Sequence, residues 1–212
     1  MKNNGIKLIE IISRESLQMG IWDPFFYRNQ NSSQQLSDYV DIIKINGKRY
    51  SSSDLKYEPL EYRDISKGYS LSFSLRRFKG NKQGKFNIVG EQVLLFGTMR
   101  AYLGNVCVTP KASWIQKESP IVFPINSEFV QITPKDGFLY FWWAFLQSPS
   151  FLNMLPTGSG GTRPRVKKEL LSNTPVEIPT LEQREEIHKK LILLAEHEWK
   201  NFCNKEKIIS TL

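Results

Sequence analysis

Apolar and polar residues alternate or fall into short runs through the middle of the chain, a spacing typical of β-strands. The clearest case is residues 69–75, where four apolar residues alternate with three serines, and we predict a half-buried strand there. Asn46-Gly47 predicts a turn between extended segments. Further strands are predicted at residues 60–65, 93–96, 106–108, 121–123 and 129–132, with residues 40–43 forming a strand or a short helix.

The later part of the chain begins with the spacing of a buried helix. Residues 137–147, GFLYFWWAFLQ, are apolar on nearly every side, which predicts a core helix. Thr133 and Pro134, with Asp136 behind them, predict where that helix begins. A glycine-rich basic loop, TGSGGTRPRV, follows at residues 157–166, and a short strand is predicted at residues 176–178 between two prolines.

A second, longer helix is predicted from Thr180 towards the C-terminus. Thr180 and Gln183 have the spacing of a capping box, and apolar residues then recur every three or four positions to form one seam. Because so long a helix extends past what a small domain covers, we predict that the seam binds a partner helix. The alternative is a helix folded back on its own domain. The seam consists of Ile187, Leu191, Leu194, Ala195, Trp199 and Phe202.

These elements predict an α+β fold: a β-rich domain with core helices over residues 1–179, then a long coiled-coil-forming helix over residues 180–212. No apolar run approaches the ~20 residues of a membrane span, and the N-terminus lacks a signal-peptide pattern. Cys107 and Cys203 lie far apart, which indicates reduced thiols in a cytosolic protein. We therefore expect a cytoplasmic protein with no metal and no cofactor.

Positive charge changes the picture. The net charge of +8 favours a polyanionic partner, either nucleic acid or an anionic membrane, over the plain alternative of solubility. Residues 76–86, RRFKGNKQGKF, hold five cations and no acid, so this stretch is either a DNA contact or a solvated hairpin tip. We predict DNA contacts from Lys48, Arg49, Arg76, Arg77, Lys79, Lys82, Lys85, Arg100, Tyr102, Arg163, Arg165 and Lys167.

Several of these residues have a structural alternative. Arg100 and Tyr102 follow a core strand, where a rigid support often carries binding residues, but Arg100 is equally suited to tie down a loop through a carbonyl. Arg163 and Arg165 either contact DNA or pin the long helix to the domain. Asp23-Pro24, followed by aromatic residues, is similar to the box of amino-methyltransferases, yet the second proline and a cofactor-binding glycine turn are missing. We therefore predict an aromatic anchor there and no catalytic residue.

Six phrases in order resemble the DNA specificity (S) subunit of type I restriction–modification systems. The phrases span most of the chain, and the match is strong because their order is kept. They are Trp22-Asp23-Pro24 with Phe26-Tyr27; residues 36–40 with 44–50; residues 61–65 with Gly68; Gly90-Glu91 with residues 95–104; residues 138–149; and residues 158–166 with 178–184 and Ile187.

The resemblance implies a target recognition domain followed by a conserved long helix. Such a domain reads one half of a bipartite site in double-stranded DNA, while methyltransferase (M) and restriction (R) subunits perform the chemistry. Members of the family carry two such units in tandem, and their helices form a spacer and dock the M subunits. This chain holds one unit, which implies either a half subunit that forms a homodimer through its helix or a piece cut from a longer chain.

We therefore expect sequence-specific recognition of duplex DNA, without catalysis, as the specificity subunit or half subunit of a type I system. One alternative is the specificity part of a type IIB- or IIG-like restriction–methyltransferase system. Another is an adaptor that reads no DNA and binds M subunits through its helix. A methyltransferase or nuclease in its own right is less favoured, because neither a cofactor loop nor a strand-borne pair of acids with a lysine stands out.

Overall fold

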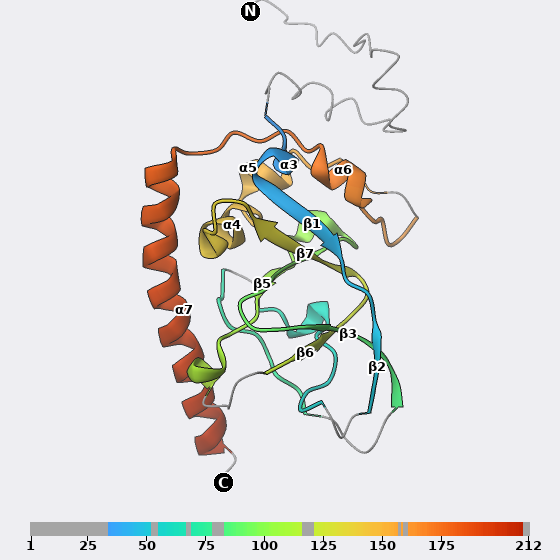
Figure 1. The fold of residues 1–212 in the computed structure, drawn as a ribbon, viewed down its shortest axis with the longest axis vertical. Helices are drawn as coiled ribbons and strands as arrows, with labels where there is room; N and C mark the ends of the chain where they lie inside the picture. The colour runs from blue at the N-terminus through green and yellow to red at the C-terminus, as the bar shows by residue number, and fades with distance from the viewer. Residues whose placement is uncertain are drawn as a thin grey trace, which may run out of the picture.

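Two antiparallel sheets lie at the centre of the fold, with helices packed around them (Figure 1). The computed structural model describes residues 34–51, 55–66, 69–77, 83–115, 121–156, 158 and 161–209. The larger sheet has the strand order β1-β7-β4-β5 and the smaller one β2-β3-β6, so the fold is α+β as predicted. The strands are β1 (Val40–Lys44), β2 (Lys48–Ser51), β3 (Gln83–Val89), β4 (Leu94–Gly97), β5 (Val106–Val108), β6 (Phe123–Ile125) and β7 (Phe129–Pro134).

Short helices connect these strands, and one long helix ends the chain. The α-helices are α3 (Leu36–Tyr39), α4 (Leu139–Phe145), α5 (Pro149–Leu152), α6 (Lys168–Ser172) and α7 (Leu181–Ile209). Three single-turn 3₁₀ helices are η1 (Tyr62–Asp64), η2 (Ala101–Leu103) and η3 (Ala112–Ile115). None of the helices in these described ranges is long and apolar enough to cross a membrane.

The strands predicted at residues 93–96, 106–108 and 129–132 are confirmed as β4, β5 and β7. Residues 45–47 join β1 to β2 without the turn predicted at Asn46-Gly47, and the two strands lie in different sheets because β1 pairs with β7 and β2 with β3. Residues 40–43 all belong to β1, so the strand alternative for that stretch is confirmed; the one-turn helix α3 ends just before it. The strand predicted at residues 121–123 lies two residues later, as β6.

The predicted start of the core helix is wrong. Thr133 and Pro134 are the last residues of β7, where they pair with Asp41 and Val40 of β1. The helix α4 begins at Leu139 instead. Asp136 lies just before the helix, and its carboxylate accepts hydrogen bonds from the Phe138 N–H at 3.0 Å and from the Trp142 indole at 3.1 Å. Sheet pairing thus overrides a local helix-start signal.

Two other predicted strands are replaced by irregular backbone. Residues 60–65 contain the 3₁₀ turn η1, and residues 69–75 form only an isolated bridge between Ile65 and Phe73. The alternation still sorts the side chains, since Leu71 and Phe73 are buried while Ser74 is exposed. Residues 176–178 are extended without forming a strand, beside a single bridge from Gln35 to Pro175.

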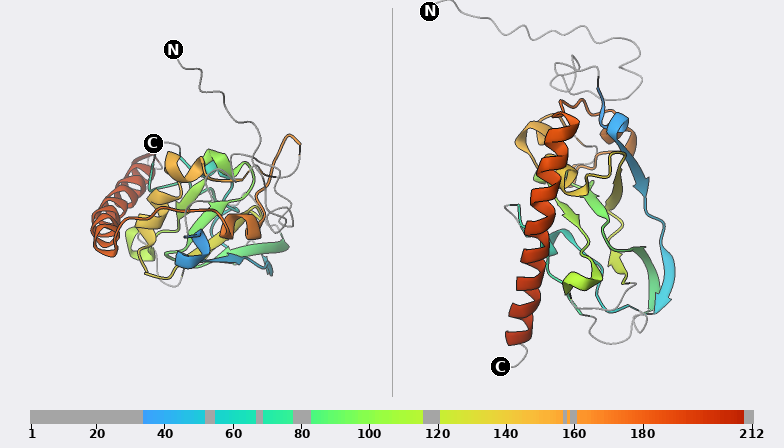
Figure 2. Two further views of the ribbon diagram at one scale, coloured as in Figure 1. Left: turned by 90° about the horizontal axis from the view of Figure 1, so that it is seen from above. Right: turned by 60° about the vertical axis from the view of Figure 1, so that its left-hand side comes forward.

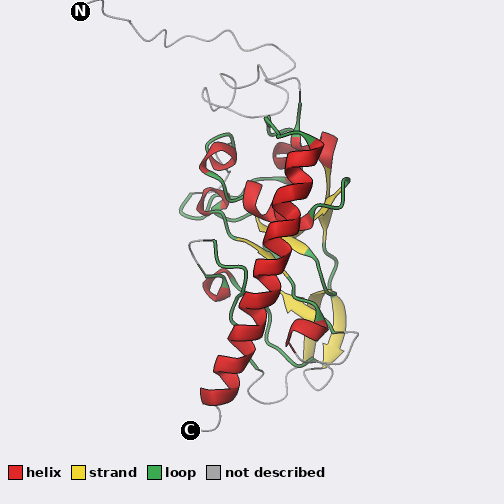
Figure 3. Ribbon diagram, turned by 90° about the vertical axis from the view of Figure 1, so that its left-hand side faces the viewer, coloured by secondary structure: helices red, strands yellow, loops and turns green. Residues whose placement is uncertain are grey.

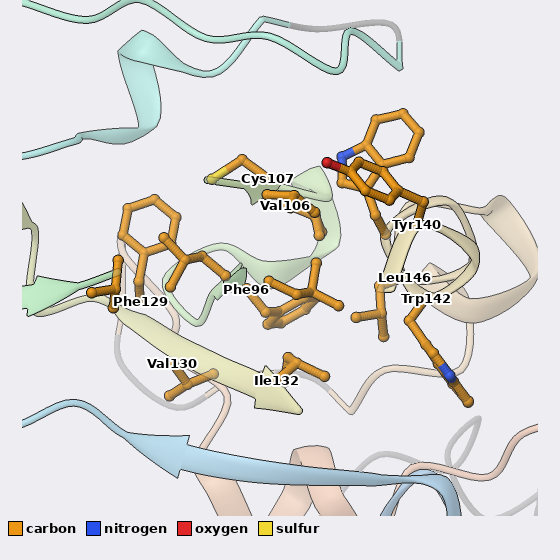
Figure 4. Packing of buried hydrophobic residues seen from close by; sticks show 14 of the residues in the cluster. Phe96, Val106, Cys107, Phe129, Val130, Ile132, Tyr140, Trp142 and Leu146 are labelled. Atoms are coloured by element: carbon orange, nitrogen blue, oxygen red, sulfur yellow. The ribbon is translucent and has the colours of Figure 1, made fainter. Parts of the chain in front are cut away.

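The core lies between the larger sheet and α4. The strand β4 is buried at all four positions because it has a neighbour on each side. Figure 4 shows Phe96 of β4, Ile132 of β7 and Leu146 after α4 close together in this cluster.

The helix α7 runs along one side of the domain over most of its length (Figure 1, Figure 3). It contacts α4 and η3. Ala195 and Trp199 are fully buried and belong to the same hydrophobic cluster as the sheet residues. The helix is therefore docked on its own domain, which was the alternative weighed from the sequence.

Candidate nucleic-acid interface

The glycine-rich loop closes on the segment that follows β4. The Arg100 N–H donates to the Pro164 carbonyl at 2.7 Å, the Val166 N–H donates to the Thr98 carbonyl at 3.0 Å, and Met99 bridges Arg165. These contacts add residues 164–166 to the backbone of residues 98–100. We call this paired region, residues 98–100 with 161–166, the loop clamp.

Two arginines of the loop clamp bind within the chain. Arg165 grips the Glu128 carboxylate with two parallel bonds, Nε to Oε2 at 2.8 Å and Nη2 to Oε1 at 2.7 Å. This hydrogen-bonded guanidinium lowers the pKa of the Glu128 carboxyl. Arg100 has a left-handed backbone with φ of 49° and donates from Nη2 to the Thr162 carbonyl at 3.0 Å. The structural alternative for Arg100, tying down a loop through a carbonyl, is therefore the arrangement observed.

Tyr62 hydrogen-bonds both to the loop clamp, at Met99, and to Glu128 beside it. Its hydroxyl donates to the Glu128 carbonyl at 3.0 Å and accepts from the Met99 N–H at 3.2 Å. Burial is the main cause that raises the pKa of Tyr62 to about 12. A Cβ at Gly97 would lie 2.6 Å from the Tyr62 ring, so the ring reaches this position only over a glycine. Three separate phrases of the sequence, at residues 61–65, 95–104 and 158–166, therefore meet at one place.

Arg76, one of the predicted DNA contacts, is bound within the chain. Its Nε and Nη2 donate to the Asp64 carboxylate at 2.7 and 2.9 Å, and Nη2 also donates to the Pro59 carbonyl at 2.9 Å. Its Nη1 pairs with Glu58. All three guanidinium nitrogens are thus engaged, and Asp64 is buried. The stretch 76–86 contains no acid, but folding brings acids to it from residues 58–64.

The β2–β3 ladder gathers other predicted residues by its register. Lys48 lies opposite Phe86, and Arg49 lies directly opposite Lys85. Two basic positions are therefore neighbours across the strands, an arrangement that destabilises a sheet unless a counter-charge is near. Arg77 is exposed and bridges Tyr57. Lys79 and Lys82 lie outside the described residues.

The remaining predicted residues are exposed. Arg163 lies at the outside of the loop clamp, and Lys167 is the N-cap residue of α6. Tyr102 is 57% exposed and lines a hollow of about 350 Å³ together with Tyr69. Both the β2–β3 ladder and the loop before α6 lie on the side of the molecule away from α7 (Figure 1, Figure 2). The β2–β3 ladder and the loop before α6 thus carry two groups of basic positions away from α7, whereas Arg77 pairs with Tyr57, which lies near Cys203 and Glu206 of α7.

The predicted helix interface divides into two sets, and this is a correction. Ala195 and Trp199 are 0% exposed, and Leu191 and Phe202 are partly buried against the core. These four side chains face the chain's own domain, because the aromatic residues of α4 and residues 69–73 cover them; Trp199, for example, meets the Phe73 ring edge-on at 5.0 Å. Exposed members of the predicted seam are Ile187, at 37%, and Leu194, at 56%.

Polar side chains that sequence reasoning missed hold α7 in place. Arg184, only 9% exposed, forms an ion pair with Asp136. Glu198 accepts hydrogen bonds from the Leu71 and Ser72 N–H groups at 3.1 and 3.0 Å, and from the hydroxyls of Ser70 and Ser72. Burial acts to raise the pKa of Glu198, but these hydrogen bonds outweigh it and the pKa is lowered. Glu198 lies one turn from Leu194 and Phe202 of the apolar seam, and a charged residue at that spacing was the signal that could have found it.

The architecture is that of a small α+β domain with a helix docked on one side and basic positions gathered on the other. In the described ranges, no group of three or more His, Cys, Asp or Glu side chains could hold a metal ion. A family model for the type I restriction modification DNA specificity domain matches residues 34–196. The chain belongs to this family.

Solved structures and curated proteins were also compared with the chain. One similar solved chain comes from a structure titled as the structural basis of complex assembly and conformational transition of the type I R-M system. It is 15% identical with a TM-score of 0.47, and the match covers 92% of this chain and 46% of that one. The present chain therefore spans less than half the length of that solved chain. No curated protein matches.

Proposed function

We propose that this chain recognises a specific sequence in duplex DNA as the specificity part, or half of it, of a type I restriction–modification complex. The observation that carries the proposal is the family match over residues 34–196, which is a match to a DNA specificity domain. The net charge of +8 supports it, because DNA is the polyanion that such a domain would meet.

The β2–β3 ladder supports the same proposal by its electrostatics. Arg49 and Lys85 occupy directly opposite positions of two strands, and two basic residue types at such a pair favour a counter-anion such as a phosphate. Within the loop clamp Arg163 is exposed and adds a further cation, and the loop before α6 lies away from α7, as the β2–β3 ladder does (Figure 2). Polar side chains near these phosphate contacts would then read base edges, each good bidentate contact discriminating by about 1–3 kcal/mol.

Methyl transfer and cleavage belong, in this proposal, to M and R subunits with which the chain assembles in the cytoplasm. The functional division is at residues 179/180: the domain reads DNA, and the outward face of α7 takes part in assembly. Ile187 and Leu194 are the exposed members of the predicted seam and fit a partner helix, whether from an M subunit or from a second copy; Leu181, Leu193 and Ile208 of α7 are exposed as well.

The test is selection of bound duplexes from a random pool, with the chain alone and with its M subunit, followed by a salt titration of the selected duplex. We expect an enriched sequence and an affinity that falls with a log–log slope of about −0.9 for each phosphate neutralised. A palindromic bipartite site would indicate a dimer of two copies. Binding that selects no sequence would contradict the proposal, and turnover of labelled S-adenosylmethionine by the pure chain would contradict its non-catalytic part.

A further inference from the structure

The two arginines of the glycine-rich loop have different surroundings. Both carboxylate oxygens of Glu128 accept hydrogen bonds from Arg165. The Nε and Nη2 donors of this guanidinium are therefore already used within the chain. Arg163 is exposed, and its side chain forms no hydrogen bond or ion pair within the described part of the chain, although its charge helps to lower the pKa of Glu128. Only the Arg163 backbone is held, because its carbonyl accepts from Arg165 Nη1 at 3.4 Å.

The backbone that carries Arg163 is fixed on both sides. On the N-terminal side, Arg100 binds the Thr162 carbonyl. On the C-terminal side, the Pro164 and Val166 backbone groups pair with residues 98–100, and Arg165 is bound to Glu128. Gly158 closes the arrangement, since a Cβ there would lie 2.8 Å from the Arg165 backbone. A charged side chain on a pre-ordered backbone loses less conformational entropy when it binds an anion.

We infer that Arg163 is the residue of this loop that contacts a DNA phosphate, and that Glu128 and Arg165 are positioning residues that hold it ready. The inference rests on the proposed function. It gives the two arginines different roles, with Arg163 contacting DNA and Arg165 positioning the loop. A phosphate is the target because most protein–DNA hydrogen bonds go to the sugar–phosphate backbone and fix the register of the protein on the duplex. The Glu128–Arg165 pair adds no net charge to the surface, whereas Arg163 adds a full positive charge.

The experiment measures the affinity of the whole chain for a mixed-sequence duplex as a function of salt, in four variants. Arg163→Ala should weaken binding by about 5-fold at about 0.15 M salt and reduce the slope of the log–log plot by about 0.9. Arg163→Lys should restore most of both, because a phosphate contact needs only the charge. Glu128→Gln combined with Arg165→Gln leaves the net charge unchanged, and should weaken binding while keeping the slope. Arg63→Ala is the matched control, since Arg63 is an exposed arginine paired with Glu61, and should change neither quantity.

A further combination separates positioning from simple loss of structure. When Arg163→Ala is added to the Glu128→Gln, Arg165→Gln background, its effect on affinity should shrink, because a loosened loop has already weakened the contact without removing it. Circular dichroism and denaturant midpoints close to those of the original chain should accompany all variants. The inference is overturned if Arg163→Ala keeps the original slope while the paired glutamine variant reduces it by about 0.9, since Arg165 would then be the DNA contact. An original chain whose affinity ignores salt on every duplex would overturn the proposed function itself, and this inference with it.

Discussion

The two sides of this molecule treat charge in opposite ways. On the α7 side, the charged groups are matched by the chain itself: Arg184 meets Asp136, and Glu198 accepts from backbone and hydroxyl donors of residues 70–72. On the other side, the β2–β3 register sets Arg49 opposite Lys85, and Arg163 is exposed at the outside of the loop clamp. A buried charge without a partner lowers the stability of the fold. An exposed cation such as Arg163 has no such cost and can bind an anion from outside the chain.

The difference shows that a charge in the sequence says little until its partner is known. Arg76 and Arg163 both lie in basic, glycine-containing loops. Folding surrounds Arg76 with Glu58 and Asp64 and leaves Arg163 exposed. The first arginine therefore stabilises the fold, and the second is available to a polyanion. Variants on each side should separate these two kinds of role.

The largest effect is expected on the docked side. Trp199→Ala should lower the free energy of unfolding by about 3–5 kcal/mol, because it removes a fully buried indole and leaves a cavity against Phe73. Leu193→Ala, at a side chain on the same helix that is 69% exposed, should change it by less than about 0.5 kcal/mol. Denaturant unfolding followed by far-UV circular dichroism measures both. Equal effects at the two positions would mean that α7 is not docked as described.

Next in size is Gly97→Ala, which tests the support of the loop clamp. The added methyl group would lie 2.6 Å from the Tyr62 ring, so we expect a loss of about 1–3 kcal/mol of stability through overpacking. Gly90→Ala is the matched control, because nothing lies within 4 Å of a Cβ at that position. A Gly97→Ala chain as stable as the Gly90→Ala chain would show that Tyr62 does not approach the end of β4.

Glu198→Gln should destabilise the chain by about 1 kcal/mol at neutral pH, since it weakens charge-assisted hydrogen bonds to residues 70–72. The pKa of Glu198 is lowered in the folded chain. Its contribution to stability is therefore present above the unfolded pKa of about 4.3 and is lost as pH falls through the lower folded value. Unfolding curves at neutral and acidic pH should show the two chains converging in acid. A difference that stays constant with pH would refute the role given to this carboxylate.

The smallest effects on stability, but clear effects on DNA binding, are expected on the basic side. Lys85→Ala should leave the unfolding free energy within about 0.5 kcal/mol of its original value and reduce the salt slope of DNA binding by about 0.9. Arg76→Ala should do the reverse, losing stability because Asp64 is left buried without its partner. Filter binding over a range of salt concentrations distinguishes them. If the salt slope of DNA binding fell in Arg76→Ala and not in Lys85→Ala, then Arg76 and not Lys85 would be the DNA contact.

Local signals were predicted well where a few neighbouring residues decide the structure. The capping box at the start of α7 is confirmed, with Thr180 N–H donating to Gln183 at 3.0 Å and Gln183 N–H to Thr180 at 3.4 Å. The strand β4 is confirmed because a continuous apolar run fits a central strand. The family resemblance, drawn from six phrases, is confirmed by the family match over residues 34–196.

Distant contacts were not predictable in the same way. Residues 69–75 alternate like a strand, yet the Leu71 and Ser72 N–H groups donate to Glu198, more than a hundred residues later in the chain. The apolar seam of α7 was predicted from its periodicity, but periodicity cannot say whether Trp199 faces a partner or its own domain. The acidic partners of Arg76 were not predictable for the same reason, because Glu58 and Asp64 reach it only through the fold.

The central claim is that the basic side reads duplex DNA, and one titration tests it most directly. The affinity of the unmodified chain is measured over a range of salt concentrations, both for the duplex selected from a random pool and for a scrambled duplex of equal length. We predict a steep negative slope on both duplexes, about −0.9 for each phosphate contacted, with tighter binding of the selected duplex at every salt concentration. A slope near zero, or equal affinity for the two duplexes, would contradict the account.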